Sequence, residues 1–240
     1  MLKNKKYLFG LSMAFLCYLL QRGYWYGING TTMYQYITLI FGTVSLGDEK
    51  NMMWNMALWL VPQIVILIYY ADFFEKNIVA NQSLLFSRTN KRKTILIQYS
   101  LKLGIRVVLM VLLELGMATI IGIIFGVSFE QMGIKFWIEV FNIIGAMSFI
   151  IIMLNLLSLF MNPLYGIIFV LFFEWVQIFL IQKHRVLGKY LPVAGILQEI
   201  RIESSKVQAG KMGLCLILFI VGVEVIAIWS YQKKKDVLTS

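Results

Sequence analysis

Three glutamates lie inside long apolar runs of this sequence, where charged side chains are rare. Glu114, Glu174 and Glu224 each fall near the middle of such a run. A carboxylate within a bilayer is costly, so each is expected to face the interior of a helix bundle or a cavity. Two interpretations are open: a polar transport path or proton-linked site, or a protonated or hydrogen-bonded carboxyl that holds helices together. For the second interpretation the possible partners are Asn142, Asn155 and Gln177.

Residue types that catalyse reactions or bind metals are scarce. The single histidine, His184, falls in a predicted loop, so histidine-based metal clusters and Ser/His/Asp arrangements lack parts. Cys17 and Cys215 lie in apolar segments without metal-ligand spacing and are interpreted as apolar fillers. The phosphate-binding motif G-x-x-x-x-G-K-[ST] does not occur, nor does a glycine-rich dinucleotide motif. We therefore expect no catalytic residues, no metal and no cofactor on this chain.

The composition indicates a membrane protein. Of the 240 residues, 60% are hydrophobic and 14% are charged, whereas about a quarter of an average soluble chain is charged. The apolar residues are grouped in runs close to the roughly 20 residues that a membrane-spanning helix needs. The net charge of +10 comes largely from basic residues at the ends of these runs, which favours an orientation signal over nucleic-acid binding. The predicted fold class is an all-α, polytopic membrane protein.

The order of the apolar runs predicts a single transmembrane domain over residues 1–240 with six membrane-spanning helices. The predicted spans are about 6–22, 53–73, 105–125, 136–160, 164–181 and 212–231. Residues 34–46 are apolar but too short to span, so an interfacial or re-entrant segment is expected there. Pro62 predicts a kink in the second span, and Asn162-Pro163 predicts a turn between the fourth and fifth. Gly122 and Gly126, spaced four apart with Gly116 before them, suggest close helix packing.

The most basic stretch of the chain is 74–106, between the second and third spans. Residues 90–125 contain no proline and can form one helix longer than about 50 Å. One face of its first part carries the polar stripe Lys91, Gln98, Lys102 and Arg106, and another carries the apolar stripe Ile95, Tyr99 and Leu103. This half is expected at the cytoplasmic interface, with the half after Arg106 in the membrane.

The distribution of basic residues sets the predicted topology. Six spans place both termini on the same side, and more of the lysines and arginines then lie inside than outside. The basic external segment 182–211 weakens this bias. A five-span arrangement with one end reversed is the alternative.

This layout resembles the ABC-2 type transporter permeases, the membrane subunits of ATP-driven exporters. The features that carry the resemblance are six spans with both ends inside, a cytoplasmic loop at about 74–93, and an external segment at about 182–211. The short chain and the sequence SRTNKRKT before the long helix are similar to permeases of small bacterial peptide-export and bacteriocin-immunity systems. In that family the loop holds a coupling helix that docks on the ATPase subunit. The resemblance implies this role for Ile78, Leu84, Leu85, Phe86, Arg88, Lys91 and Arg92.

The resemblance also implies the partners and the activity. The chain would lie in the cell membrane with cytoplasmic termini and pair with a second permease copy, identical or homologous. Two copies of a separate ATPase would bind ATP and Mg. The assembly would export an amphipathic peptide or lipid-like substrate by alternating access. The alternatives are the substrate-binding membrane subunit of a vitamin-type importer, an intramembrane enzyme that uses the buried glutamates, and a membrane-embedded partner protein without a transport role.

Overall fold

The described part of the chain is mostly helical. The computed structural model describes residues 5–42, 52–80, 92–129 and 133–184, with residues 191, 221, 222 and 225. Within these residues no strand forms, and the only bridge pair is Thr32 with Ser128. The all-α fold class is therefore confirmed. The elements are α1 (Lys5–Ile28), α2 (Met33–Gly42), α3 (Met52–Tyr70), the short π-helix η1 (Glu75–Val79), α5 (Arg92–Ile124), α6 (Ile134–Leu157) and α7 (Pro163–Lys183).

Among the residues that the structure describes, four helical segments are long and apolar enough to cross a membrane: Ala57–Val79, Thr94–Ile124, Phe136–Leu157 and Pro163–Lys183. They indicate a membrane-embedded protein. α1, where the first span was expected, is not among the four, and its last part from Gln21 is polar and aromatic rather than aliphatic. The expected sixth span, 212–231, lies outside the described residues except for 221, 222 and 225. The six-span count thus stays a prediction.

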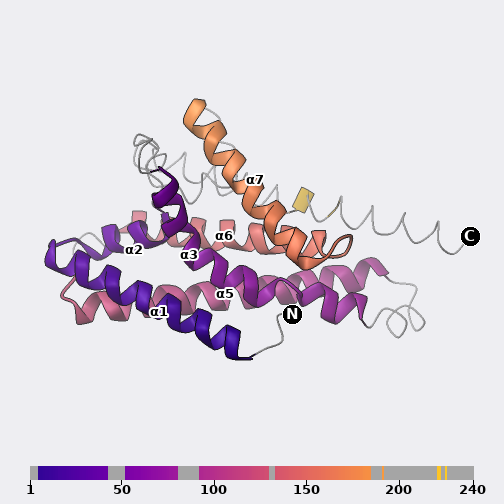
Figure 1. Cartoon of the computed structure of the whole chain (residues 1–240), viewed down its shortest axis with the longest axis horizontal. Coiled ribbons are helices and arrows are strands. Elements are labelled where there is room, and N and C mark those ends of the chain that lie inside the picture. Colours follow the sequence, from indigo (N-terminus) through magenta and orange to yellow (C-terminus); the bar gives the residue numbers. More distant parts are fainter. Residues whose placement is uncertain are drawn as a thin grey trace, which may run out of the picture.

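α5 is the helix around which the others are arranged. It packs against α1, α2, α3 and α6, while α7 packs against α6. Figure 1 shows α1, α5 and α6 running alongside one another, with α7 crossing them obliquely. With 33 residues, α5 is about 50 Å long, which agrees with the single long helix expected from the proline-free sequence.

One side of α5 is buried along its whole length. The buried positions recur at helical spacing: Leu96, Ser100, Leu103, Val107, Val111, Glu114, Ala118 and Ile121. The expected polar stripe lies on an exposed face, where Gln98, Lys102 and Arg106 project outward. Further along, the exposed face is aliphatic, with Leu109, Leu113 and Ile120 each more than half exposed. Such a face suits lipid.

Glycines allow close packing where α1, α2 and α5 meet. A Cβ on Gly27 would lie 2.2 Å from the carbonyl oxygen of Phe125, so no larger residue fits there without movement. A Cβ on Gly122 would lie 2.9 Å from the Tyr36 ring of α2, whereas a Cβ on Gly116 would meet nothing within 4 Å. Gly126 has a φ of 78° and ends α5: its N–H bonds to the Ile123 carbonyl, and the next N–H bonds to the Gly122 carbonyl. We call this the glycine end of the bundle, defined by Gly23, Gly27, Gly122 and Gly126.

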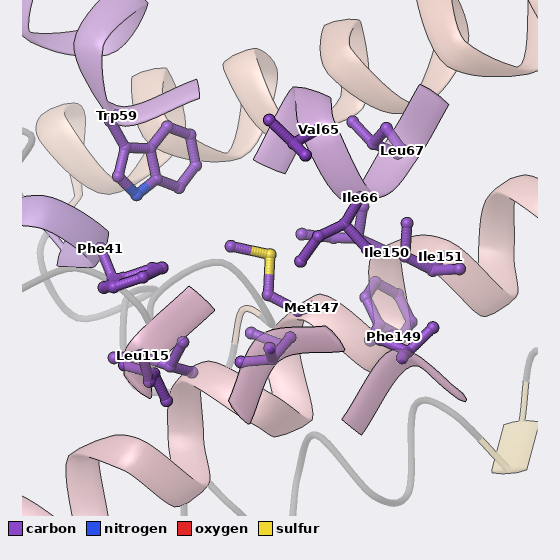
Figure 2. Close-up of a cluster of buried hydrophobic side chains, with 14 of the residues drawn as sticks. Phe41, Trp59, Val65, Ile66, Leu67, Leu115, Met147, Phe149, Ile150 and Ile151 are labelled. Atoms are coloured by element: carbon purple, nitrogen blue, oxygen red, sulfur yellow. The ribbon is translucent and has the colours of Figure 1, made fainter. Parts of the chain in front are cut away.

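α2 is a ten-residue helix packed into the bundle. It begins with a reciprocal cap, because the Gln35 backbone N–H donates to the Thr32 hydroxyl and the Thr32 N–H donates to the Gln35 side chain. Met33, Tyr36, Ile37, Ile40 and Phe41 are all at most 2% exposed. α2 is too short to span, as expected for this segment. Figure 2 shows how its last turn joins the core, with Phe41 near Trp59, Leu115 and Met147.

Candidate functional site

The α3 helix is interrupted by an amide side chain from α6. In a continuous helix the Phe74 N–H would donate to the Tyr70 carbonyl. Instead, the Asn155 side chain lies between them: its Oδ1 accepts from the Phe74 N–H at 3.0 Å, and its Nδ2 donates to the Tyr70 carbonyl at 2.9 Å. A second bond from Nδ2 reaches the Ile151 carbonyl of its own helix at 3.0 Å. This insertion breaks α3 between Tyr70 and Phe74 while leaving both backbone groups satisfied.

The residues at the break contact α5 as well as α6. The Tyr70 hydroxyl donates to the Arg106 carbonyl at 3.3 Å, and the Arg106 guanidinium lies 5.1 Å from the centre of the Phe73 ring. The next turn contains an ion pair between Lys76 and Asp72. We call this region the basic end of the bundle, defined by Lys76, Lys102 and Arg106. We call the place where the Asn155 side chain interrupts the helix, between Tyr70 and Phe74, the α3 joint.

The expected coupling residues begin directly after the α3 joint. Ile78 is fully buried in η1, so its side chain anchors this segment to the bundle. Glu75, Lys76 and Val79 are the exposed residues of the same turn. Arg92 is the first residue of α5. The remaining expected coupling residues, Leu84, Leu85, Phe86, Arg88 and Lys91, lie outside the described residues.

A second polar contact crosses the middle of the bundle. Glu174 lies mid-way along α7 and is 1% exposed. With its amide nitrogen facing Glu174, Gln63 of α3 donates to Oε2 at 2.9 Å and to Oε1 at 3.1 Å. Both carboxyl oxygens therefore have a partner, which satisfies the group inside an apolar protein.

Glu114 of α5 lies at about the same level of the bundle as the Gln63–Glu174 contact, and it has no hydrogen-bond partner among the described residues. The hydrogen bond from the Tyr70 hydroxyl to the Arg106 carbonyl places Arg106 of α5 opposite the end of α3. Glu114 comes eight residues after Arg106 along α5, and Pro62 comes eight residues before Tyr70 along α3. Since α3 and α5 run in opposite directions, Glu114 lies level with Pro62 to within about a turn. Its side chain is fully buried, and neither carboxyl oxygen has a hydrogen-bond partner among the described residues.

Two buried N–H groups lie in the same layer. Trp59 precedes Gln63 by one helical turn. The bonds of Asn155 to Tyr70 and Phe74 fix how α6 lies along α3. Asn142 precedes Asn155 by about as many residues as Trp59 precedes this contact, so Asn142 and Trp59 lie at the same level. Trp59 Nε1 and Asn142 Nδ2 also have no partner in the described part of the chain. Figure 2 shows Trp59 above Phe41, among the buried apolar side chains of the core. We call Trp59, Gln63, Glu114, Asn142 and Glu174 the buried polar layer.

The three carboxylates expected within the membrane differ in what the structure shows of them. Glu174 is hydrogen-bonded, Glu114 is buried with no hydrogen-bond partner in the described part of the chain, and Glu224 lies outside the described residues. Among the described residues no hydrogen bond joins Glu114 to Glu174. The partner of Glu174, Gln63, was not among the predicted partners; the available signal was an amide inside an apolar run, one turn after a tryptophan.

Asn155 was considered as a partner for a carboxyl, but it binds backbone groups instead. No group of three or more His, Cys, Asp or Glu that could hold a metal occurs in the described segments.

Comparison of the chain with models of known protein families, with curated proteins and with solved structures finds no match.

Proposed function

We propose that this chain is the membrane-spanning permease subunit of an ATP-driven, ABC-2 type exporter. In this proposal two copies of a separate ATPase bind ATP and Mg, and this chain pairs with a second permease copy in the cell membrane. The substrate is an amphipathic peptide or a lipid-like molecule. The chain itself performs no catalysis.

The observation that carries the proposal is the α3 joint. Coupling requires that a push on a cytoplasmic segment moves membrane helices, so the segment has to be fixed to more than one of them. Asn155 ties the end of α3 to α6, Tyr70 and Phe73 contact Arg106 of α5, and Ile78 is buried directly afterwards. A displacement of the segment that follows is therefore transmitted to α3, α5 and α6 together.

The mechanism that follows is alternating access. Closure of the ATPase pair on ATP pushes the segment 74–93, with Glu75, Lys76 and Val79 as its exposed beginning. The Asn155 amide bonds to both the Tyr70 carbonyl and the Phe74 N–H. The part of the helix after Tyr70 can therefore change direction without leaving either backbone group unbonded. The tilt of α3 and α5 then opens a path between the two permease copies.

A matched pair of surface variants tests this coupling. Val79→Asp places a charge on the exposed face after the α3 joint, and Phe129→Asp makes a comparable change at the glycine end, where Phe129 is 50% exposed. Each tagged variant is purified from membranes together with the ATPase. We expect Val79→Asp to reduce the recovered ATPase by about tenfold, the effect of losing about 1.4 kcal/mol at an interface. Phe129→Asp should leave the recovery unchanged.

The amount of each variant in the membrane fraction serves as the control for insertion. Equal recovery of the ATPase with Val79→Asp and with the unaltered chain would show that coupling does not pass through this segment.

A further inference from the structure

The buried polar layer contains unpaired hydrogen-bonding groups of both kinds. Glu114 presents two acceptor oxygens, while Trp59 Nε1 and Asn142 Nδ2 are N–H donors. Buried polar atoms in folded proteins nearly always have partners. Here an acceptor and two donors share one level of the bundle, yet none of them bonds to another within the described residues. A bound molecule with the complementary groups would satisfy all three.

We propose that the buried polar layer binds the amino end of an amphipathic, peptide-like molecule. An ammonium group pairs with Glu114, and an adjacent carbonyl oxygen accepts hydrogen bonds from Trp59 and Asn142. The inference rests on the proposed function in that it assigns a site and a chemical class to the exporter's substrate.

The combination of groups selects this chemistry. A carboxyl group surrounded by apolar side chains requires a cation or a donor close to it. A bare cation would leave the Trp59 and Asn142 N–H groups unpaired, and a hydrocarbon chain would pair with none of the three. An amine next to a carbonyl supplies both a donor and an acceptor.

The surroundings of the layer match the rest of such a molecule. Phe41, Leu115 and Met147 belong to the same cluster of buried apolar side chains as Trp59 (Figure 2), which suits an alkyl or apolar side chain. The indole ring of Trp59 adds a face that attracts an ammonium group. Gln63 and Glu174 already satisfy each other one turn away, so their pair offers no free group to the ligand.

Two probes that differ only at the amine test the proposal. Leucine octylamide has an ammonium group beside an amide carbonyl, and its N-acetyl derivative has the same carbonyl and alkyl chain without the charge. Equilibrium binding of each radiolabelled probe is measured on the purified full chain in mild detergent, with protein-free detergent as the blank. We expect the free amine to bind at least about tenfold more tightly, as charge-assisted hydrogen bonds predict.

Three variants assign the effect to residues. Glu114→Gln keeps the size of the side chain and should abolish the preference for the free amine. Trp59→Phe keeps an aromatic ring but removes the N–H, and should weaken both probes several-fold. Asn29→Ala removes an exposed amide outside the layer and should bind like the unaltered chain.

Two results would overturn the inference: equal affinity of the unaltered chain for both probes, or a preference for the amine that survives in Glu114→Gln. The probe comparison needs no variant, so it decides the question even if Glu114→Gln fails to fold. The binding assay contains no ATPase, so the site and the proposed function are tested separately. Probe binding by a chain that recovers no ATPase would refute the exporter and keep the site. Recovery of the ATPase without probe binding would refute the site alone.

Discussion

Asn155 and Gln63 are both amides inside apolar helices, but they satisfy different kinds of group. Asn155 bonds to the backbone of α3 and replaces one rung of that helix, whereas Gln63 bonds to the Glu174 carboxyl on α7. The first contact fixes where α3 breaks, and the second ties α7 to α3. An amide serves in both cases because it has a donor and an acceptor side by side.

At the residue scale, the Gln63–Glu174 contact should show a coupling energy. Gln63→Leu leaves the Glu174 carboxyl buried without its partner and should lower the free energy of unfolding by about 1–2 kcal/mol. Adding Glu174→Leu removes the unpaired group and should recover part of this loss. The measurement is a double-mutant cycle of unfolding in mixed micelles. Purely additive losses would show that the two side chains do not interact.

The α3 joint makes a prediction at the scale of the element. Asn155→Leu removes the inserted amide, so the Phe74 N–H can bond to the Tyr70 carbonyl and continue the helix. The segment after Tyr70 should then point in a new direction. Spin labels at Val79 and Leu101, both exposed, report this as a shifted distance distribution. Asn29→Ala, which removes an exposed amide directly after the last residue of α1, is the control. An unshifted distribution in Asn155→Leu would mean that the amide does not maintain the break.

Glycine substitutions test the packing of α1 against α5. Gly27→Ala places a Cβ 2.2 Å from the Phe125 carbonyl oxygen and should destabilise the bundle strongly, because backbone has to move. Gly126→Ala puts a side chain at a φ of 78° and should cost about 1–2 kcal/mol. Gly116→Ala meets nothing within 4 Å in a helix and should be neutral or stabilising. Thermal unfolding of the three variants checks this order, and a Gly116→Ala variant as unstable as Gly27→Ala would contradict it.

The elements were more predictable than the contacts between them. The length of α5 follows from the absence of proline, and the start of α7 follows from Asn162-Pro163: the Asn162 side chain accepts from the Leu164 N–H at 3.0 Å, with proline in the first turn. Both signals are local. The partner of Glu174 is an amide on another helix, and no local pattern connects positions so far apart in the chain. Trp59 is buried, and α2 packs against α3, which carries it, but the sequence alone does not show where α2 packs.

At the scale of the whole molecule, the two ends of the bundle have different tasks. The glycine end holds α1, α2 and α5 in close contact, whereas the basic end contains the α3 joint and the start of the segment 74–93. The buried polar layer lies between them. In the proposed exporter the basic end receives the movement, the glycine end stays packed, and the layer between them meets the substrate.

The most direct test of the proposed function is to purify the tagged chain from its native membrane in mild detergent and identify what accompanies it. If the chain is an exporter permease, we expect an ATPase with a G-x-x-x-x-G-K-[ST] motif in equal amount, and ATP-dependent transport once the complex is placed in vesicles. Recovery of the chain without any ATPase, together with no ATP-dependent transport, would contradict the exporter proposal.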